Sequence, residues 1–115
     1  MEIQDVFRRL GIGRQYLGYN AALRAVEMTI EDESCLYCVK QGIYVPISVH
    51  ANCDWRTVER NIRTVIQRAW CVNPDMVIEM AGFPLHQAPT VTEFIEMVSA
   101  YVLSANHSQR KSMHA

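Results

Sequence analysis

The spacing of apolar side chains within Asp54–Trp70 is the feature that most limits what this chain can fold into. If the segment is helical, one side of it carries only apolar residues, at positions i, i+4, i+7, i+8 and i+11: Val58, Ile62, Val65, Ile66 and Ala69. Such a stripe is typical of a helix that buries one face in a protein core. Asp54 stands where a carboxylate can accept hydrogen bonds from the first free N–H groups of the helix. We therefore predict an amphipathic helix over Asp54–Trp70.

Similar apolar spacing and end signals predict further helices on both sides of this segment. In chain order they cover residues 3–10, 19–30, 35–41, 46–51, 73–80 and 90–106. Gly42 is expected to close the helix at 35–41. Pro46 suits the start of a helix, and Thr90 and Glu93 have the spacing of a capping box. No segment has a convincing strand pattern, and the pattern gives six or seven helices, so we predict an all-α fold, a compact domain of about six helices.

The helices at 46–51 and 54–70 have the order and spacing of a helix-turn-helix. A short helix is followed by a turn at Asn52-Cys53-Asp54 and then by a longer helix. Asn tolerates the left-handed backbone conformation that such a turn often needs. Ile47 and Val58 are expected to pack together and to hold the angle between the two helices.

The length and the ends of the chain fit a single domain. We assign residues 1–106 of the 115 to the helical domain and residues 107–115 to a polar tail. No run of ~18 apolar residues is present that could span a membrane. The first five residues lack the basic and apolar zones of a secretory signal, so we expect a cytoplasmic protein.

The side of helix 54–70 opposite the apolar stripe carries Arg56, Arg60, Arg63 and Gln67 at i, i+4, i+7 and i+11. Arg can bind guanine through O6 and N7, Gln can pair with adenine, and a helix fits the major groove of DNA. A solvated basic face is the ordinary alternative, since charge patterns on helices are weak evidence. The preceding short helix and turn favour DNA reading, with Arg60, in the first two turns, as the principal base contact.

The charge balance and the position of Glu59 leave alternatives open. The formal net charge is −1, which counts against a nucleic-acid partner, although a neutral total can coexist with a locally positive face. Glu59 lies beside Arg60 in the sequence. It could orient Arg60 or Arg63 by an ion pair, or accept a hydrogen bond from a cytosine amino group.

Metal, cofactor and enzyme functions find little support. Cys35 and Cys38 form a C-x-x-C pair, but no second pair follows, so we expect no metal site and interpret the cysteines as buried free thiols. The four histidines are scattered, and no nucleophile and base have a recognisable spacing. We therefore expect neither an enzyme nor a cofactor, and no small-molecule substrate.

Two stretches resemble the effector domain of the sporulation master response regulator (stage zero sporulation protein A). Residues 58–70, V-E-R-N-I-R-T-V-I-Q-R-A-W, resemble the family's recognition helix, V-E-R-x-I-R-x-x-I-x-x-A-W. Residues 89–98, P-T-V-T-E-F-I-E-M-V, are similar to the family's P-T-N-S-E-F-I-x-M-V. Gly18-Tyr19 and Ile43-Tyr44 also stand at matching places. The resemblance extends over about residues 3–104, with a short deletion around residues 85–88.

This resemblance implies a six-helix effector domain that binds double-stranded promoter DNA, with two copies paired head to tail on adjacent sites. It implies base contacts at Glu59, Arg60 and Arg63. Two positions depart from the family pattern: Thr57 replaces an arginine, and Thr64 replaces a histidine. The expected DNA-binding residues are Arg56, Thr57, Glu59, Arg60, Arg63, Thr64 and Gln67.

The family's members also carry a phospho-accepting receiver domain ahead of the effector domain. Here Met1 directly precedes the first expected helix, so the chain is either a fragment or a natural stand-alone version. The alternative function is a protein-interaction module that modulates a full-length regulator without productive DNA binding. The slightly negative net charge favours this alternative.

Overall fold

The computed structural model describes residues 2–114, with the side chains of residues 2–106, and every element in this part of the chain is helical. The α-helices are α1 (Ile3–Arg9), α2 (Tyr19–Glu31), α3 (Val45–Ala51), α4 (Trp55–Val72), α5 (Pro74–Ala81) and α6 (Val91–His114). A 3-10 helix, η1 (Glu33–Cys38), and a π-helical turn, η2 (Lys40–Tyr44), connect α2 to α3. The predicted all-α fold class is confirmed.

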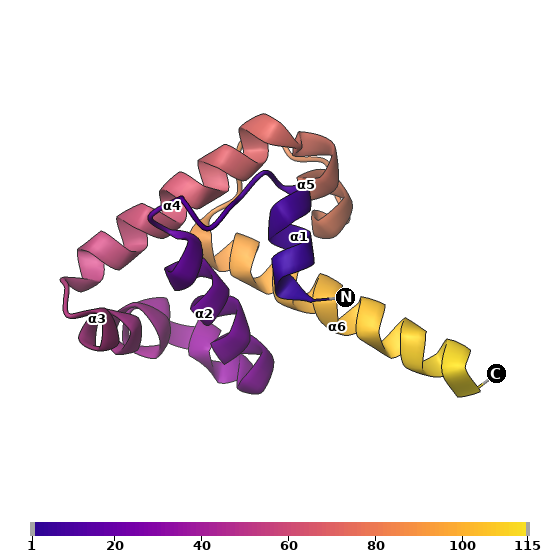
Figure 1. Ribbon diagram of the computed structural model, residues 1–115, viewed down its shortest axis with the longest axis horizontal. Coiled ribbons are helices and arrows are strands. Elements are labelled where there is room, and N and C mark those ends of the chain that lie inside the picture. The colour runs from indigo at the N-terminus through magenta and orange to yellow at the C-terminus, as the bar shows by residue number, and fades with distance from the viewer. Residues whose placement is uncertain (1, 115) are drawn as a thin grey trace.

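The core lies where α2, α4 and α6 meet. In Figure 1, α4 runs along one edge of the molecule, and α2 and α6 both pack against it. The six largest fully buried side chains come from α1 and its C-terminal cap, η2, α4 and α6: Phe7, Leu10, Ile43, Ile62, Phe94 and Ile95. Burying a side chain of this size stabilises the fold by about 1.5–3 kcal/mol. All five residues of the predicted α4 stripe are buried, so that prediction is confirmed.

Side-chain caps begin three of the helices at the predicted places. Asp54 Oδ1 accepts a hydrogen bond from the Arg56 N–H at 2.8 Å, and Asn73 Oδ1 accepts one from the Met76 N–H at 3.2 Å. Thr90 and Glu93 form the predicted capping box, with hydrogen bonds of 3.2 and 2.9 Å. The caps therefore set the first residues of α4, α5 and α6.

Replacing Asp54 by alanine is expected to destabilise the domain by about 1 kcal/mol, because the Arg56 N–H loses its hydrogen-bond acceptor. The free energy of unfolding, measured by urea titration, checks this. Glu79→Ala is the control, since Glu79 lies exposed within α5. A loss in Asp54→Ala no larger than in this control would show that the cap contributes nothing.

The short helix predicted at Cys35–Gln41 is confirmed only as a 3-10 helix followed by a π-helical turn, and its predicted end at Gly42 is wrong. The 3-10 helix ends at Cys38, and Gly42 lies inside the π-helical turn that runs directly into α3. A Cβ on Gly42 would lie 2.5 Å from the carbonyl oxygen of Cys35. The glycine is therefore explained by the close approach of two backbones and not by the end of a helix.

Gly18 allows α2 to begin directly against α4. A Cβ on Gly18 would overlap the carbonyl oxygen of Asn61 and would lie 2.6 Å from Cγ2 of Val65. Both of these groups belong to α4, so the absence of a side chain at Gly18 sets how closely the two helices pack. The position of α4 in the molecule depends on this contact.

Two further boundaries differ from the expectation. The helix predicted to end near Trp70 extends to Val72, where Asn73 then caps the next one. α6 continues to His114, through most of the segment assigned to a polar tail; the side chains of residues 107–115 lie outside the described residues. Within the described part of the chain, no helix combines the length and the apolar character needed to cross a bilayer.

Candidate nucleic-acid interface

The helix α3, the turn at residues 52–54 and the helix α4 form a helix-turn-helix. Asn52 has φ 56° and ψ 49°, the left-handed conformation predicted for this turn. Ile47 on α3 and Val58 on α4 are both buried, as expected for residues that hold the two helices together. Tyr44, which ends η2, stacks on Trp55 at the start of α4, with ring centroids 6.1 Å apart and planes 9° from parallel. The start of α4 is thus fixed from two sides.

The predicted polar row lies on the surface of α4. Arg56, Arg60, Arg63 and Gln67 are all exposed, opposite the buried stripe of the same helix. Thr64 is also exposed, and its hydroxyl donates to the Arg60 carbonyl oxygen at 3.1 Å. The structure therefore places three guanidinium groups and one amide on a single accessible side of the second helix.

Arg60 has the least engaged side chain among the three arginines of the row. Arg63 Nη2 lies 3.3 Å from Glu59 Oε1, an ion pair between side chains one turn apart. Exposed pairs of this kind contribute only about 0.3–0.5 kcal/mol, so DNA could separate them at little cost. The guanidinium of Arg60 forms no hydrogen bond or ion pair with any residue of 2–106. Of the two partners considered for Glu59, the structure selects Arg63 and leaves Arg60 available.

Lys40 is a cation beside this row that sequence reasoning missed. Its Nζ lies 4.7 Å from the centroid of the Trp55 ring, and Cζ of Arg56 lies 5.5 Å from the same ring. Trp55 is half-buried and packs against the core. Its ring also attracts the two cations Lys40 and Arg56. Lys40 lies far from Trp55 in the sequence, and neither helical periodicity nor spacing brings the two together. Only the irregular η2 turn does so.

Arg68 does not belong to the row, although it lies on the same helix. Its Nε donates to the carbonyl oxygen of Gly11 at 3.3 Å, and its guanidinium lies over the Tyr16 ring at 5.2 Å. Arg68 therefore ties α4 to the segment between α1 and α2. Arg68 is itself exposed, and its contacts with Gly11 and Tyr16 are what set it apart from the row.

The phenol of Tyr44 should lose its proton only at an unusually high pH. Burial raises the pKa of Tyr44 from 10.0 to about 12; the charge of Glu59 adds to the rise and that of Arg63 opposes it. Because the folded protein holds this proton to a higher pH than the unfolded chain, the stabilisation is complete below the unfolded pKa of 10.0 and is lost as the pH approaches about 12. In an absorbance titration of tyrosinate, Tyr44→Phe should remove the step near pH 12. An unchanged curve would contradict this assignment.

The cysteines differ from the expectation of buried thiols. Cys38, Cys53 and Cys71 are exposed, and Cys35 is half-buried. The C-x-x-C pair lies on the 3-10 helix η1, at the molecular surface. Among the described residues, no group of three or more His, Cys, Asp or Glu side chains is close enough to hold a metal ion.

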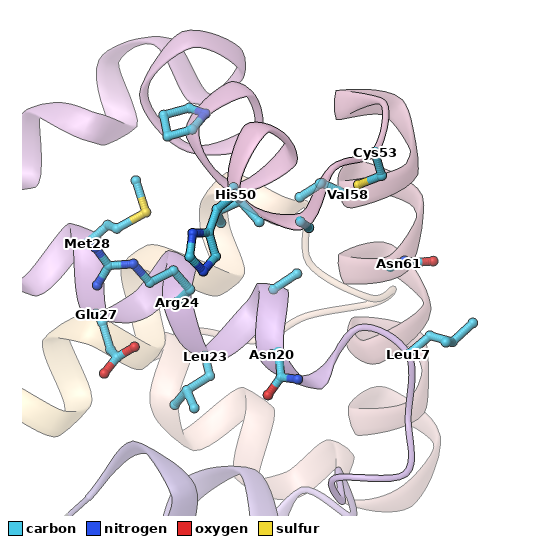
Figure 2. A pocket seen from close by; sticks show the side chains of 14 residues that line it. Leu17, Asn20, Leu23, Arg24, Glu27, Met28, His50, Cys53, Val58 and Asn61 are labelled. Carbon is cyan, nitrogen blue, oxygen red and sulfur yellow. The ribbon is translucent and has the colours of Figure 1, made fainter.

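A groove of about 840 Å³ lies between α2 and α3, away from the arginine row. Figure 2 shows Arg24 of α2 and His50 of α3 in the space between the two helices. Most other groups that line the groove are apolar, and Leu17 at its border is 88% exposed. This groove is a second accessible surface of the helix-turn-helix.

The comparison with known families agrees with this architecture. A family model described as "Sporulation initiation factor Spo0A C terminal" matches residues 3–102, which include the whole of α1 to α5. That domain is the DNA-binding part of a sporulation regulator. The resemblance of the two stretches at 58–70 and 89–98 is thereby confirmed for the fold and the family.

Proposed function

Because the chain belongs to the family of the C-terminal domain of sporulation initiation factor Spo0A, we propose that it regulates transcription by reading a specific DNA sequence with α4. The observation that carries this proposal is the exposed row of Arg56, Arg60 and Arg63 on the second helix of a helix-turn-helix. In such motifs the second helix enters the major groove. The structure of α4 supports this role because the side chains of this row are exposed to solvent.

Each residue of the row has a chemistry that suits base edges or phosphates. Arg60 and Arg63 would donate to guanine O6 and N7, and Gln67 would pair with adenine. Glu59 would accept from a cytosine amino group once DNA separates it from Arg63. Arg56, Thr57 and Thr64 flank these residues and would contact bases or the backbone. Arg60 is the principal reader because its side chain is unengaged in the free protein.

Selection of bound sequences from a random pool of duplexes tests this proposal. We expect one recurrent sequence, and fluorescence anisotropy should show much tighter binding to it than to a scrambled duplex. Binding should weaken steeply with salt, because the cations displace counterions from DNA phosphates. Enrichment of no sequence, together with equal affinity for both duplexes, would contradict specific reading.

The same selection tests the pairing of two copies on DNA. If two domains bind head to tail, the recovered sequence should contain two repeats in the same orientation on one face of the helix. Analytical ultracentrifugation with that duplex should then show two protein copies per DNA. Recovery of a single site that saturates with one copy would contradict the pairing.

A protein-interaction module remains the second candidate, and the groove between α2 and α3 is the observation that favours it. An exposed apolar side chain such as Leu17 is suited to a protein partner. The titration with DNA separates the two candidates. Tight, sequence-dependent binding by the isolated domain would dismiss a purely protein-directed function.

A further inference from the structure

A small cavity lies beside the polar row, between α4 and the start of α6. Its volume is about 360 Å³, and it is lined from three directions. α4 contributes Arg63 and Gln67, η2 contributes Tyr44, and α6 contributes its first residues, Val91 and Thr92. The cavity is open to solvent on the side that carries the proposed base-reading residues, since Arg63 and Gln67 are themselves exposed.

Several of the groups around this cavity are hydrogen-bond donors. The first N–H groups of a helix have no partner within the helix. In α6 the capping box satisfies the Glu93 N–H, whereas the N–H groups of Val91 and Thr92 form no hydrogen bond with any described residue. The positive end of the helix dipole lies at the same place. Arg63 adds a full positive charge and Gln67 an amide.

Tyr44 adds a hydroxyl donor from a third element. The residue is only 6% exposed and lines the cavity, and its hydroxyl forms no hydrogen bond with any residue of 2–106. The hydroxyl keeps some contact with solvent, so an acceptor that enters the cavity from outside the chain can reach it.

We propose that this cavity binds a phosphate of the DNA backbone through Tyr44, Arg63 and the N-terminal N–H groups of α6, and thereby fixes the depth and register of α4 in the major groove. This inference rests on the proposed reading of DNA by α4. Helix N-termini bind phosphates well, and backbone contacts of this kind orient a protein on the duplex without reading its sequence. The phosphate adjoins the bases that Arg63 and Gln67 contact.

The test combines Tyr44→Phe with DNA in which single phosphates are replaced by uncharged methylphosphonates. Tyr44→Phe keeps the ring that stacks on Trp55 and removes only the hydroxyl. Tyr101→Phe is the matched control, because Tyr101 is half-buried on α6 and does not line the cavity. Thermal unfolding of each variant checks that the fold is retained.

In the wild type and in Tyr101→Phe, we expect one methylphosphonate position at which affinity falls about tenfold, the effect of losing a hydrogen bond to a charged group. In Tyr44→Phe, affinity for unmodified DNA should already be about tenfold lower, for specific and scrambled duplexes alike. The same methylphosphonate should then cost less than about threefold. Equal losses in Tyr44→Phe and in the wild type at every position would overturn the proposal.

Titration of the free protein with inorganic phosphate, against chloride at equal ionic strength, distinguishes the two sources of phosphate. If the pocket has the proposed chemistry, the amide NMR signals of Val91 and Thr92 should shift in the wild type and not in Tyr44→Phe. If these signals shift but Tyr44→Phe changes the effect of no methylphosphonate, the cavity binds free phosphate. The proposed contact with a DNA phosphate is then wrong. If the domain binds no specific DNA sequence, the proposed function is wrong. The amide signals of Val91 and Thr92 would still show whether the cavity binds phosphate.

Discussion

Replacing Arg60 by alanine is expected to weaken binding to the selected DNA site by roughly ten- to a hundredfold, which corresponds to ~1–3 kcal/mol. The physical reason is that Arg60 presents an unengaged guanidinium on the exposed side of α4. Its loss removes a bidentate contact with one base pair, so specificity should relax at that position and remain elsewhere. Anisotropy titrations with duplexes that vary one base pair at a time measure both effects.

Arg68→Ala is the control for charge, because it removes one positive charge from the same helix. Arg68 is held by the Gly11 carbonyl oxygen and the Tyr16 ring, away from the row. We expect its DNA affinity to stay within about threefold of the wild type, while stability falls by ~0.5–1.5 kcal/mol from the lost hydrogen bond. If Arg60→Ala and Arg68→Ala weaken DNA binding equally, only the total charge of α4 matters and Arg60 reads no base.

Replacing Gly18 by alanine is expected to destabilise the domain by ~1–3 kcal/mol, the usual cost of forcing an extra carbon into a packed interior. The new Cβ would overlap the Asn61 carbonyl oxygen and approach Val65 Cγ2 to 2.6 Å. Because the first of these atoms belongs to the backbone of α4, the helix itself must move. Urea unfolding gives the loss of stability, and the DNA affinity of the variant should also fall.

Gly13→Ala provides the comparison at a second glycine. Its Cβ would meet only the end of the Gln15 side chain, which is exposed and can rotate away. We expect a change in the free energy of unfolding within about 0.5 kcal/mol, the range of ordinary surface substitutions. Equal stability of Gly18→Ala and the wild type would show that α2 and α4 tolerate a wider separation than the structure indicates.

The helices of this domain were predictable because most carry two consistent signals. The stripe of α4 gave its buried face, and Asp54 gave its first turn. Asn73 and Thr90 likewise marked the starts of α5 and α6. Where local chemistry and hydrophobic periodicity agree in this way, the element can be located without knowledge of its tertiary neighbours.

The segment between α2 and α3 was not predictable by the same means. A glycine such as Gly42 is typical of a helix end. Here it is explained by close contact with the backbone of Cys35, and hydrophobic periodicity does not predict such a contact. The same segment brings Lys40 to Trp55 and Tyr44 to the cavity beside α6. The residues of the polar row could therefore be predicted from helical geometry, whereas the groups that surround the row depend on an irregular turn.

The local charge also explains how a chain of net charge −1 can bind DNA. Arg56, Arg60 and Arg63 share one exposed side of α4, and Lys40 lies beside Arg56 over the Trp55 ring. Glu59 offsets part of this charge by pairing with Arg63. Counterion release depends on the cations that meet phosphates and not on the total charge of the chain.

The most direct test of base reading by α4 is to replace each guanine of the selected site, one at a time, by 7-deazaguanine, which lacks only the major-groove acceptor N7. For the wild type, affinity should fall at particular guanines, and for Arg60→Ala the loss at one of them should disappear while the others persist. This coupling would assign that guanine to Arg60. Affinities that are unaffected by 7-deazaguanine, or losses that are the same in the wild type and in Arg60→Ala, would contradict the account.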